Sequence, residues 1–313
     1  MLSRRPEIEP AAIDAVLAAA FGRSVPVTYA RTLDGVSTQV YRVVRGDETF
    51  YLRIAEESHE NLETDAALHR RLLSAGVKLP DIVSVEAFNV RIGRSVMVTT
   101  EVRGGSLEIQ SDAVIEDAGA DLARINAVPV DGFGWVQRTG SAWPLAAEFP
   151  TYEPFLMSYL PSRWPGVLEK VFAADDLDLI EDLIEQERSA APVRALLAHG
   201  DFDASPIFAD ESGYSGLIDF GEIRGTERSF DLGHFYLHDE GAPMLPALLR
   251  GYERVTALPG DHMIAIRRSA ILLGLRQLCR WLGPPRHLTM DHPLPVSRIQ
   301  RISELLRPSS PGA

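Results

Sequence analysis

The sequence has the composition of an ordinary globular protein with an acidic balance. Of its 313 residues, 45% are hydrophobic and 24% are charged, which excludes a chain that is disordered over most of its length. Its 31 Lys and Arg against 44 Asp and Glu give a net charge of −13, and this argues against binding along a nucleic-acid backbone. Cys279 is the single cysteine, so the chain holds no internal disulfide and no cysteine-based metal cluster.

The length favours two domains or one large bilobed domain. No apolar run reaches the roughly 20 residues that a membrane-spanning helix needs. Arg4 and Arg5 near the start are followed by acidic residues rather than by the apolar core of a signal peptide. We therefore expect a cytoplasmic protein that associates with neither membranes nor nucleic acids.

The N-terminal third of the chain is predicted to be rich in β-strands. Apolar residues at helical spacing indicate two helices, and runs of β-branched and aromatic residues between turn signals indicate five strands. In chain order these are residues 10–21 (helix), 25–33, 39–44 and 49–54 (strands), 61–75 (helix), and 82–87 and 95–102 (strands). Asp34-Gly35 and Gly46-Asp47 mark turns, and Gly76 stands where a helix C-cap is expected. The sequence Arg103-Gly104-Gly105-Ser106 ends this pattern and is predicted to be a hinge.

The rest of the chain is predicted to be mainly helical, with an interval of short strands. Helical spacing covers residues 111–126, 152–160, 165–172 and 177–190, and later 230–240, 243–255, 261–281 and 293–306. Between them, apolar runs at 195–198, 206–209 and 215–220 are typical of strands, and residues 308–313 are predicted to be disordered. A small antiparallel-sheet lobe (residues 1–103) before a larger, mainly helical lobe (residues 104–313) is the α+β layout of a bilobed protein kinase.

Two aspartates carry the clearest chemical signal. Asp201 in His199-Gly200-Asp201 and Asp219 in Ile218-Asp219-Phe220-Gly221 each follow a short apolar run. Phosphoryl transfer needs one carboxylate that orients the attacking hydroxyl and accepts its proton, and another that holds magnesium. Asp also caps helices and turns, which is the alternative interpretation of each residue alone.

In this order, the motifs resemble those of the aminoglycoside phosphotransferase-like small-molecule kinases, which have a protein-kinase-like fold. A later Asp231-Leu232 also fits this family. Residues 33–43 look like its nucleotide-covering hairpin, residues 96–104 like its last N-lobe strand and hinge, and residues 122–126 like one of its helix ends. The resemblance covers about residues 25–240. It implies transfer of the γ-phosphate of ATP or GTP to a hydroxyl of a small molecule, with Mg²⁺ as cofactor.

The resemblance also implies roles for individual residues. Asp201 is the expected catalytic base, His199 supports its loop by hydrogen bonding, and Asp219 is the expected magnesium ligand. The expected nucleotide-binding residues are Gly35 and Ser37 near the triphosphate, Arg53 at a phosphate, Asp65 (or Glu63) as the ion-pair partner of Arg53, and backbone groups of Thr100–Val102 at the adenine. Gly35 fits an ordinary hairpin turn equally well, and Arg53 fits a simple strand-face charge.

One position departs from the family pattern. Where the family has a magnesium-binding asparagine, five residues after the base, this chain has Pro206, which has no side-chain oxygen. Ser205 is the expected substitute, with Asp203 as the next candidate. Magnesium keeps several waters and needs only one or two carboxylates, so a weakened site is physically possible. The alternative hypothesis is therefore a kinase-like protein that binds a nucleotide or ligand with little or no transfer.

A third interpretation involves the histidines. His234 and His238 are spaced i, i+4 on a predicted helix and can in principle bind zinc, as part of a metallohydrolase built around Asp201 and Asp219. This interpretation lacks a third ligand and the His-Glu-x-x-His pattern. We therefore do not expect a zinc site.

Overall fold

The computed structural model describes residues 7–22, 26–32, 39–106, 111–160, 164–189, 194–240, 243–284 and 286–307. Gly35, Ser37 and the predicted disordered tail lie outside the described residues. The chain forms two compact units. Unit 1 consists of Met1–Leu107, Gln137–Leu145 and Ile207–Phe220, and unit 2 consists of Glu108–Val136, Ala146–Pro206 and Gly221–Ala313.

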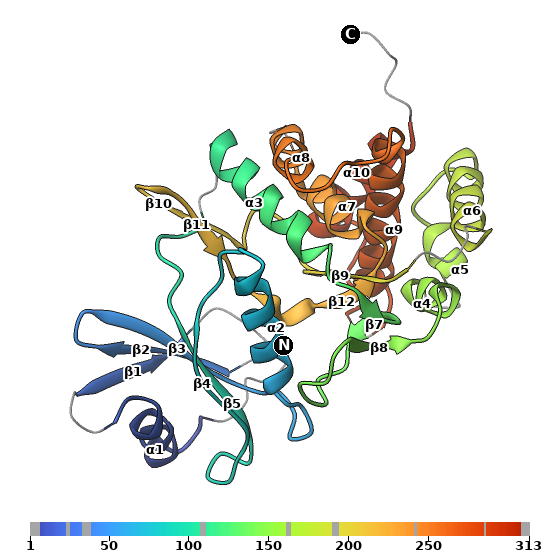
Figure 1. Ribbon diagram of the computed structural model, residues 1–313. Helices are drawn as coiled ribbons and strands as arrows, with labels where there is room; N and C mark the ends of the chain where they lie inside the picture. The colour runs from blue at the N-terminus through green and yellow to red at the C-terminus, as the bar shows by residue number, and fades with distance from the viewer. Residues whose placement is uncertain are drawn as a thin grey trace. The chain divides into compact units, whose positions relative to one another are not determined.

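The centre of unit 1 is a five-stranded antiparallel sheet with strand order β1-β2-β3-β5-β4 (Figure 1). Its strands are β1 (Val27–Arg31), β2 (Gln39–Arg45), β3 (Glu48–Ile54), β4 (Ile82–Asn89) and β5 (Arg94–Thr100). Alternate residues of β3 are buried, as in a strand that packs one face on a core. All five strands agree with the predicted ones to within a few residues.

Two helices of unit 1 pack on opposite faces of this sheet. Helix α1 (Pro10–Phe21) packs against Leu52 and Val98, and helix α2 (Glu63–Ser74) packs against Met97. Neighbouring residues of a strand point to opposite faces, which explains why Met97 and Val98 meet different helices. Arg53 is paired with Met97 in the strand register and therefore lies on the α2 face.

A later hairpin also belongs to unit 1. Strands β10 (Ile207–Asp210) and β11 (Gly213–Leu217) pair with each other. Leu217 N donates to Lys78 O at 2.9 Å, and Gly105 N donates to Ala209 O at 3.1 Å. These bonds explain why the hairpin belongs with the N-terminal segment. The division of the chain into an N-terminal lobe of residues 1–103 and a C-terminal lobe of residues 104–313 stays a prediction.

Unit 2 contains a second sheet, with strand order β6-β8-β7-β12-β9. The strands are β6 (Val130–Asp131), β7 (Phe133–Val136), β8 (Leu145–Phe149), β9 (Leu196–Ala198) and β12 (Arg224–Thr226). Only β9 was expected from the sequence. The others are two to five residues long, too short for a reliable periodicity.

Helices make up most of unit 2, as the sequence predicted. They are α3 (Asp112–Ile125), α4 (Tyr152–Tyr159), α5 (Trp164–Leu168), α6 (Ala174–Ser189), α7 (Ser229–His238), α8 (Leu245–Glu253), α9 (His262–Leu282) and α10 (Pro293–Leu306), and a short 3-10 turn, η1, covers Phe220–Glu222. None of the helices in the described ranges is long and apolar enough to cross a membrane. The predicted α+β class, with an antiparallel N-terminal sheet and a helical C-terminal part, is confirmed.

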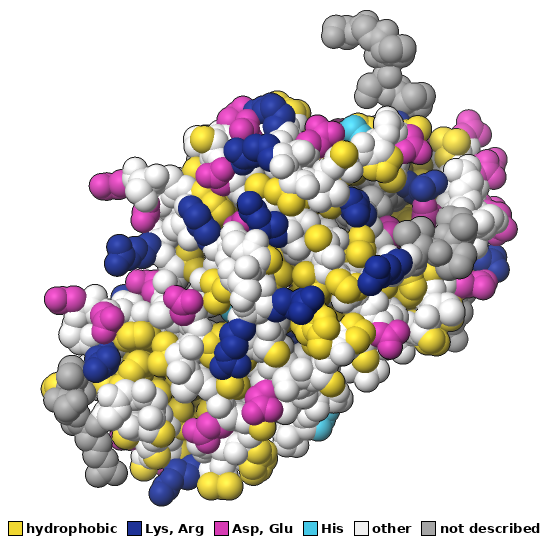
Figure 2. Space-filling view, in the orientation of Figure 1, with side chains coloured by type: hydrophobic (Ala, Val, Ile, Leu, Met, Phe, Trp, Pro, Cys, Tyr) yellow, Lys and Arg dark blue, Asp and Glu magenta, His cyan; other side chains and the backbone are white. Residues whose placement is uncertain are grey.

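Charged side chains are mixed over much of the face seen in Figure 2, and acidic ones gather over α6. The residues of α6 that carry this charge include Asp175, Asp176, Asp178, Glu181 and Asp182. Its buried side chains Ile180 and Ile184 are spaced i, i+4, so the helix packs through one apolar stripe. Of these acidic residues, Asp175, Asp178, Glu181 and Asp182 are exposed and Asp176 is half-buried.

Close backbone contact between α3 and α8 generates a prediction. A Cβ atom added to Gly251 would lie 1.8 Å from Glu116 O. We expect Gly251→Ala to lower the free energy of unfolding by about 1–3 kcal/mol, because neither backbone can move away without losing packing elsewhere. Gly166→Ala is the matched control, because a Cβ at this helical glycine meets no atom within 4 Å. Urea unfolding that shows equal midpoints for both variants would contradict this account of the α3–α8 contact.

Candidate active site

A cavity of about 430 Å³ lies in unit 1 on the sheet face that carries Met97. Three predicted nucleotide-binding residues line it, Arg53, Thr100 and Val102, together with the predicted magnesium ligand Asp219. The remaining lining residues are Thr32, Val40, Tyr51, His69, Pro80, Met97, Thr99, Phe208, Ile218 and Phe220. The fold thus brings together around one cavity residues that are far apart in the sequence.

Arg53 and Asp65 approach each other beside this cavity. Arg53 Nη1 lies 3.7 Å from Asp65 Oδ1, and the Asp65 side chain is fully buried. A second arginine is closer, because Arg138 Nε donates to Asp65 Oδ2 at 2.9 Å. Glu63 instead interacts with Asn61, whose Nδ2 lies 3.5 Å from Glu63 Oε2. Asp65 therefore contacts two arginines, and Arg138 was not anticipated from the sequence.

Asp219 occupies an unusual backbone conformation at the cavity. Its φ is 64°, in the left-handed region that Asp tolerates better than most residues. Arg138 Nη2 donates to the carbonyl of Phe220 at 3.2 Å, which fixes the turn that follows Asp219. The Asp219 side chain is exposed and so is available to a ligand in the cavity.

The fit of these residues to magnesium rests on the Asp219 carboxylate. Among the described residues, no three His, Cys, Asp or Glu side chains gather closely enough to hold a metal ion. Magnesium suits a site with one carboxylate because phosphate and water oxygens complete its shell. Ser205, the other predicted ligand, donates through Oγ to Asp203 Oδ1 at 2.6 Å, and Pro206 is buried.

In unit 2, the loop that carries Asp201 is held by the buried carboxylate of Asp231. His199 N donates to Asp231 Oδ2 and Gly200 N donates to Asp231 Oδ1, each at 2.9 Å. Asn126 Nδ2 adds a third bond to Asp231 at 3.0 Å and also donates to Leu197 O at 2.8 Å. The backbone before Asp201 is therefore fixed by Asp231 of α7, which is itself bonded by Asn126 at the C-terminal end of α3.

Gly200 is required by this loop geometry. Its φ is 93°, and a Cβ atom would lie 1.9 Å from Glu222 O. The ring of His199 is fully buried, with its centroid 5.6 Å from that of Phe202 in an edge-on arrangement. The His199 ring is therefore enclosed by the protein, while Asp201, two residues later, reaches solvent, and the predicted support of the loop by hydrogen bonds of this ring stays a prediction.

The carboxylate of Asp201 is more than half exposed, at 56%. A hydrogen bond with His234 lowers the pKa of Asp201, so Asp201 is ionised at neutral pH. His234 Nε2 lies 3.3 Å from Asp201 Oδ1. An exposed, ionised carboxylate on a fixed loop is suited to accept a proton from a bound hydroxyl.

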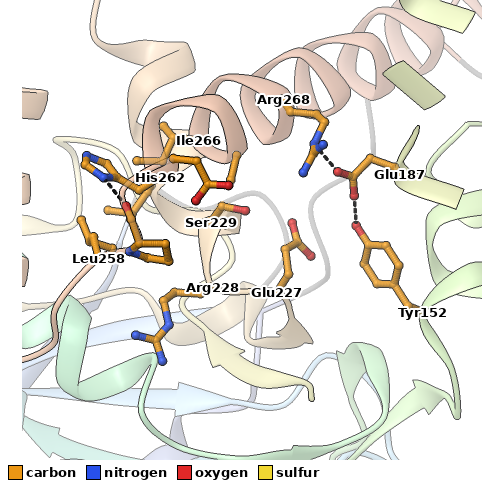
Figure 3. A pocket seen from close by; sticks show the side chains of 13 residues that line it. Tyr152, Glu187, Glu227, Arg228, Ser229, Leu258, His262, Ile266 and Arg268 are labelled. Carbon is orange, nitrogen blue, oxygen red and sulfur yellow. Dashed lines mark hydrogen bonds and ion pairs between the residues drawn. The ribbon is translucent and has the colours of Figure 1, made fainter. Parts of the chain in front are cut away.

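Unit 2 also contains a cavity of about 230 Å³ at the N-terminal ends of α7 and α9 (Figure 3). Tyr152 donates to Glu187 at 2.8 Å, and Arg268 pairs with the same carboxylate. The side chain of Glu227 lies between Glu187 on one side and Ser229 on the other (Figure 3). Its Oε2 is sealed from solvent with no hydrogen-bond partner among the described residues, and burial raises the pKa of Glu227 to about 7.

The family assignment rests on comparison with known proteins. The sequence pattern of the phosphotransferase enzyme family matches residues 28–263. The chain belongs to this family. No curated protein sequence matches the chain significantly. The match confirms the resemblance seen in the motifs, and the chain is a small-molecule kinase.

Solved structures share the fold at low sequence identity. A thermostable mutant of aminoglycoside phosphotransferase APH(4)-Ia, in complex with ADP and hygromycin B, has 16% identity and a TM-score of 0.67, with 96% of this chain and 100% of that chain covered. A putative fructosamine-3-kinase from Haemophilus somnus 129PT has 12% identity and a TM-score of 0.62, with 94% and 97% covered. A putative aminoglycoside phosphotransferase from Ralstonia eutropha JMP134 has 12% identity and a TM-score of 0.61, with 95% and 99% covered.

The two arginines at Asp65 differ in their expected roles. Arg138→Met removes the one side-chain hydrogen bond that the described residues donate to the fully buried Asp65 carboxylate, and we expect a loss of about 3–5 kcal/mol in the free energy of unfolding. Arg53→Met removes a contact at 3.7 Å and should cost about 1 kcal/mol or less, while it weakens nucleotide binding. Chemical denaturation and nucleotide calorimetry measure the two effects. Equal stability losses in both variants would contradict the distinction.

The raised pKa of Glu227 predicts a pH-dependent stability. The folded protein holds the Glu227 proton up to about pH 7, whereas the ordinary pKa of a Glu carboxyl is 4.5, so the free energy of unfolding falls as pH rises through this range. Glu227→Gln imitates the protonated form and should be more stable than wild type by about 3 kcal/mol above about pH 8, with little difference near pH 4. Denaturation at both pH values measures this. The exposed Glu169→Gln is the control, and a Glu227→Gln effect that is the same at both pH values would refute the prediction.

Proposed function

We propose that this enzyme transfers the γ-phosphoryl group of ATP or GTP to a hydroxyl of a small molecule. The observation that carries the proposal is the state of Asp201. Its carboxylate is exposed and ionised, and its loop is fixed by hydrogen bonds from the preceding amides to Asp231. This group orients the acceptor hydroxyl and takes its proton as the oxygen attacks phosphorus.

The cavity of unit 1 is the proposed nucleotide site. Arg53 lines this cavity, and its guanidinium group is the proposed contact for the phosphates. In the segment proposed to meet the adenine, Thr100 N donates to Asp81 O and Glu101 N donates to Thr49 O. We therefore assign the Val102 amide as the backbone donor to the base. The similar structure solved with ADP and hygromycin B supports a nucleotide and a small molecule as the two substrates.

Asp219 is the proposed magnesium ligand. When bound, Mg²⁺ neutralises charge on the nucleotide phosphates. Asp219 presents an exposed carboxylate in the same cavity as Arg53. The cavity therefore has an anionic group for the metal ion and a cationic group for the phosphates. Ser205 is the second proposed ligand, because its oxygen can still accept a bond while its proton is donated to Asp203.

Pro206 favours a second candidate function, which is ligand binding with little or no transfer. The proline replaces the amide oxygen that the family uses at this position, and nothing in its side chain can coordinate a cation. Tight, magnesium-dependent nucleotide binding without phosphate transfer to any acceptor would support this alternative. Calorimetry alongside the transfer assay separates the two functions.

Substitution of the two aspartates tests the proposed mechanism. With labelled ATP or GTP and a panel of aminoglycosides, amino alcohols and sugars, we expect Asp201→Asn to lower kcat by about 10²- to 10⁴-fold, because the proton acceptor is lost. Asp219→Asn should raise the Mg²⁺ concentration needed for half-maximal activity. Asp210→Asn is the control, since Asp210 is an acid at the end of β10 whose side chain accepts hydrogen bonds from Ser212 N and Oγ. Full turnover in Asp201→Asn would eliminate the assigned base.

A further inference from the structure

His234 lies within α7 and contacts the proposed catalytic base through one edge of its ring. Its Nε2 is 3.3 Å from Asp201 Oδ1, and its Nδ1 is 3.0 Å from the carbonyl oxygen of Phe202. The ring is almost completely buried, with 4% of the residue exposed. The loop and the helix therefore hold both ring nitrogens against oxygen atoms.

The chemistry of these oxygens restricts the state of the ring. A peptide carbonyl can only accept a hydrogen bond, and an ionised carboxylate can only accept. A neutral imidazole has one donor and one acceptor nitrogen, so it would leave a lone pair facing an oxygen at one of these contacts. An imidazolium has two donors and satisfies both Phe202 and Asp201.

The charges of the neighbouring side chains are compatible with a positively charged His234 ring. His238 stacks on His234 with ring centroids 4.4 Å apart and keeps its own Nδ1 3.0 Å from His234 O. Burial and the nearby His234 lower the pKa of His238, so it stays neutral. Among the described residues, other charged or titratable groups around this pair and Asp201 include Asp203 and His199 on the loop, Glu222 in η1, Asp231 on α7 and Arg298 on α10, where Arg298 donates to Leu237 O.

We propose that His234 is a positioning residue that acts as an imidazolium, donating to Phe202 O and to Asp201 Oδ1, so that Asp201 presents Oδ2 to the acceptor hydroxyl. This inference rests on the proposed function for its effect on the reaction. Such a donor fixes the rotation of a side chain that is otherwise more than half exposed and free to turn. It also keeps Asp201 ionised before the substrate arrives.

The proton balance of the reaction is unchanged by this role. The acceptor hydroxyl gives its proton to Asp201 Oδ2, and the electron pair left on its oxygen forms the new bond to the γ-phosphorus. The bond from that phosphorus to the β–γ bridging oxygen breaks, and its electron pair leaves with the nucleoside diphosphate. His234 keeps its proton throughout, and it acts only through the orientation and charge of Asp201.

Nuclear magnetic resonance of the ¹⁵N-histidine-labelled enzyme tests the protonation state without any assay of activity. The His234 signals are assigned by their loss in His234→Gln. We expect both ring nitrogens to carry a proton at about pH 7 in the wild type, and only one in Asp201→Asn, where the carboxylate is gone. A wild-type ring with a single protonated nitrogen at about pH 6 to 7 would overturn the proposal.

Kinetics of two variants test the positioning role. We expect His234→Gln to lower kcat about tenfold and His234→Leu about a hundredfold, with the nucleotide KM changed less than about twofold, because the glutamine amide can still donate one bond to Asp201. His262→Gln is the matched control, since its ring also lies against a carbonyl, 2.7 Å from Pro259 O, but at the start of α9. Equal rates in all variants, or a loss confined to KM, would overturn the role. A wild type without transfer would refute the proposed function, and the resonance experiment would then decide the state of His234 alone.

Discussion

The buried carboxylate of Asp231 is the constraint on which the geometry of unit 2 depends. It accepts three hydrogen bonds, from His199 N, Gly200 N and Asn126 Nδ2, in a place with no exposure to solvent. Hydrogen bonds of this kind offset the cost of taking a carboxylate out of water. Because Asp231 lies in the first turn of α7, the helix and the loop are fixed to each other. The contact between His234 and Asp201 follows from this attachment.

The aspartates of this enzyme fall into two environments, and the environments separate their roles. Asp65 and Asp231 are completely buried; Asp65 accepts a hydrogen bond from Arg138, and Asp231 accepts bonds from two backbone amides and one side-chain amide. Asp201 and Asp219 are exposed, and each sits next to a backbone group bonded by a side chain, the buried Asp231 in one case and the half-buried Arg138 in the other. The buried Asp65 and Asp231 therefore have a structural role, and the exposed Asp201 and Asp219 remain free to contact a ligand.

The sequence predicted the elements with strong local patterns and missed those defined by distant partners. Strands β2 and β3 have alternating burial and a turn at Gly46, so their pattern is complete within the segment. Strand β12 has three residues, and its partners are Ala198 in β9 and Trp135 in β7, so no local pattern could indicate it. Contacts between distant residues of the candidate site could not be predicted for the same reason. Arg138 lies 73 positions from Asp65, and no pattern in either segment connects them.

His234 illustrates a different limit of sequence reasoning. Its spacing with His238 suggested a zinc pair, but the ring nitrogens in fact face Asp201, Phe202 and the helix backbone. The motif that could have pointed to it is Asp231, three residues earlier, since a side chain one turn along the same helix lies on nearly the same face. The direction of that face became known only from the fold.

The division of the chain between the two units has a consequence for how relatives can exchange parts. Unit 1 is assembled from three separate stretches of sequence, and the β10–β11 hairpin reaches it only after the chain has passed through much of unit 2. A single genetic crossover near residue 104 would therefore join the sheet of one parent to the hairpin of another. The backbone bonds at Lys78 and Ala209 tolerate many side chains, but Gly104 and Gly216 meet those same segments with no room for a Cβ. We therefore expect an exchange of segments between relatives to preserve unit 1 only where both glycines are retained, although the two lie far apart in the sequence.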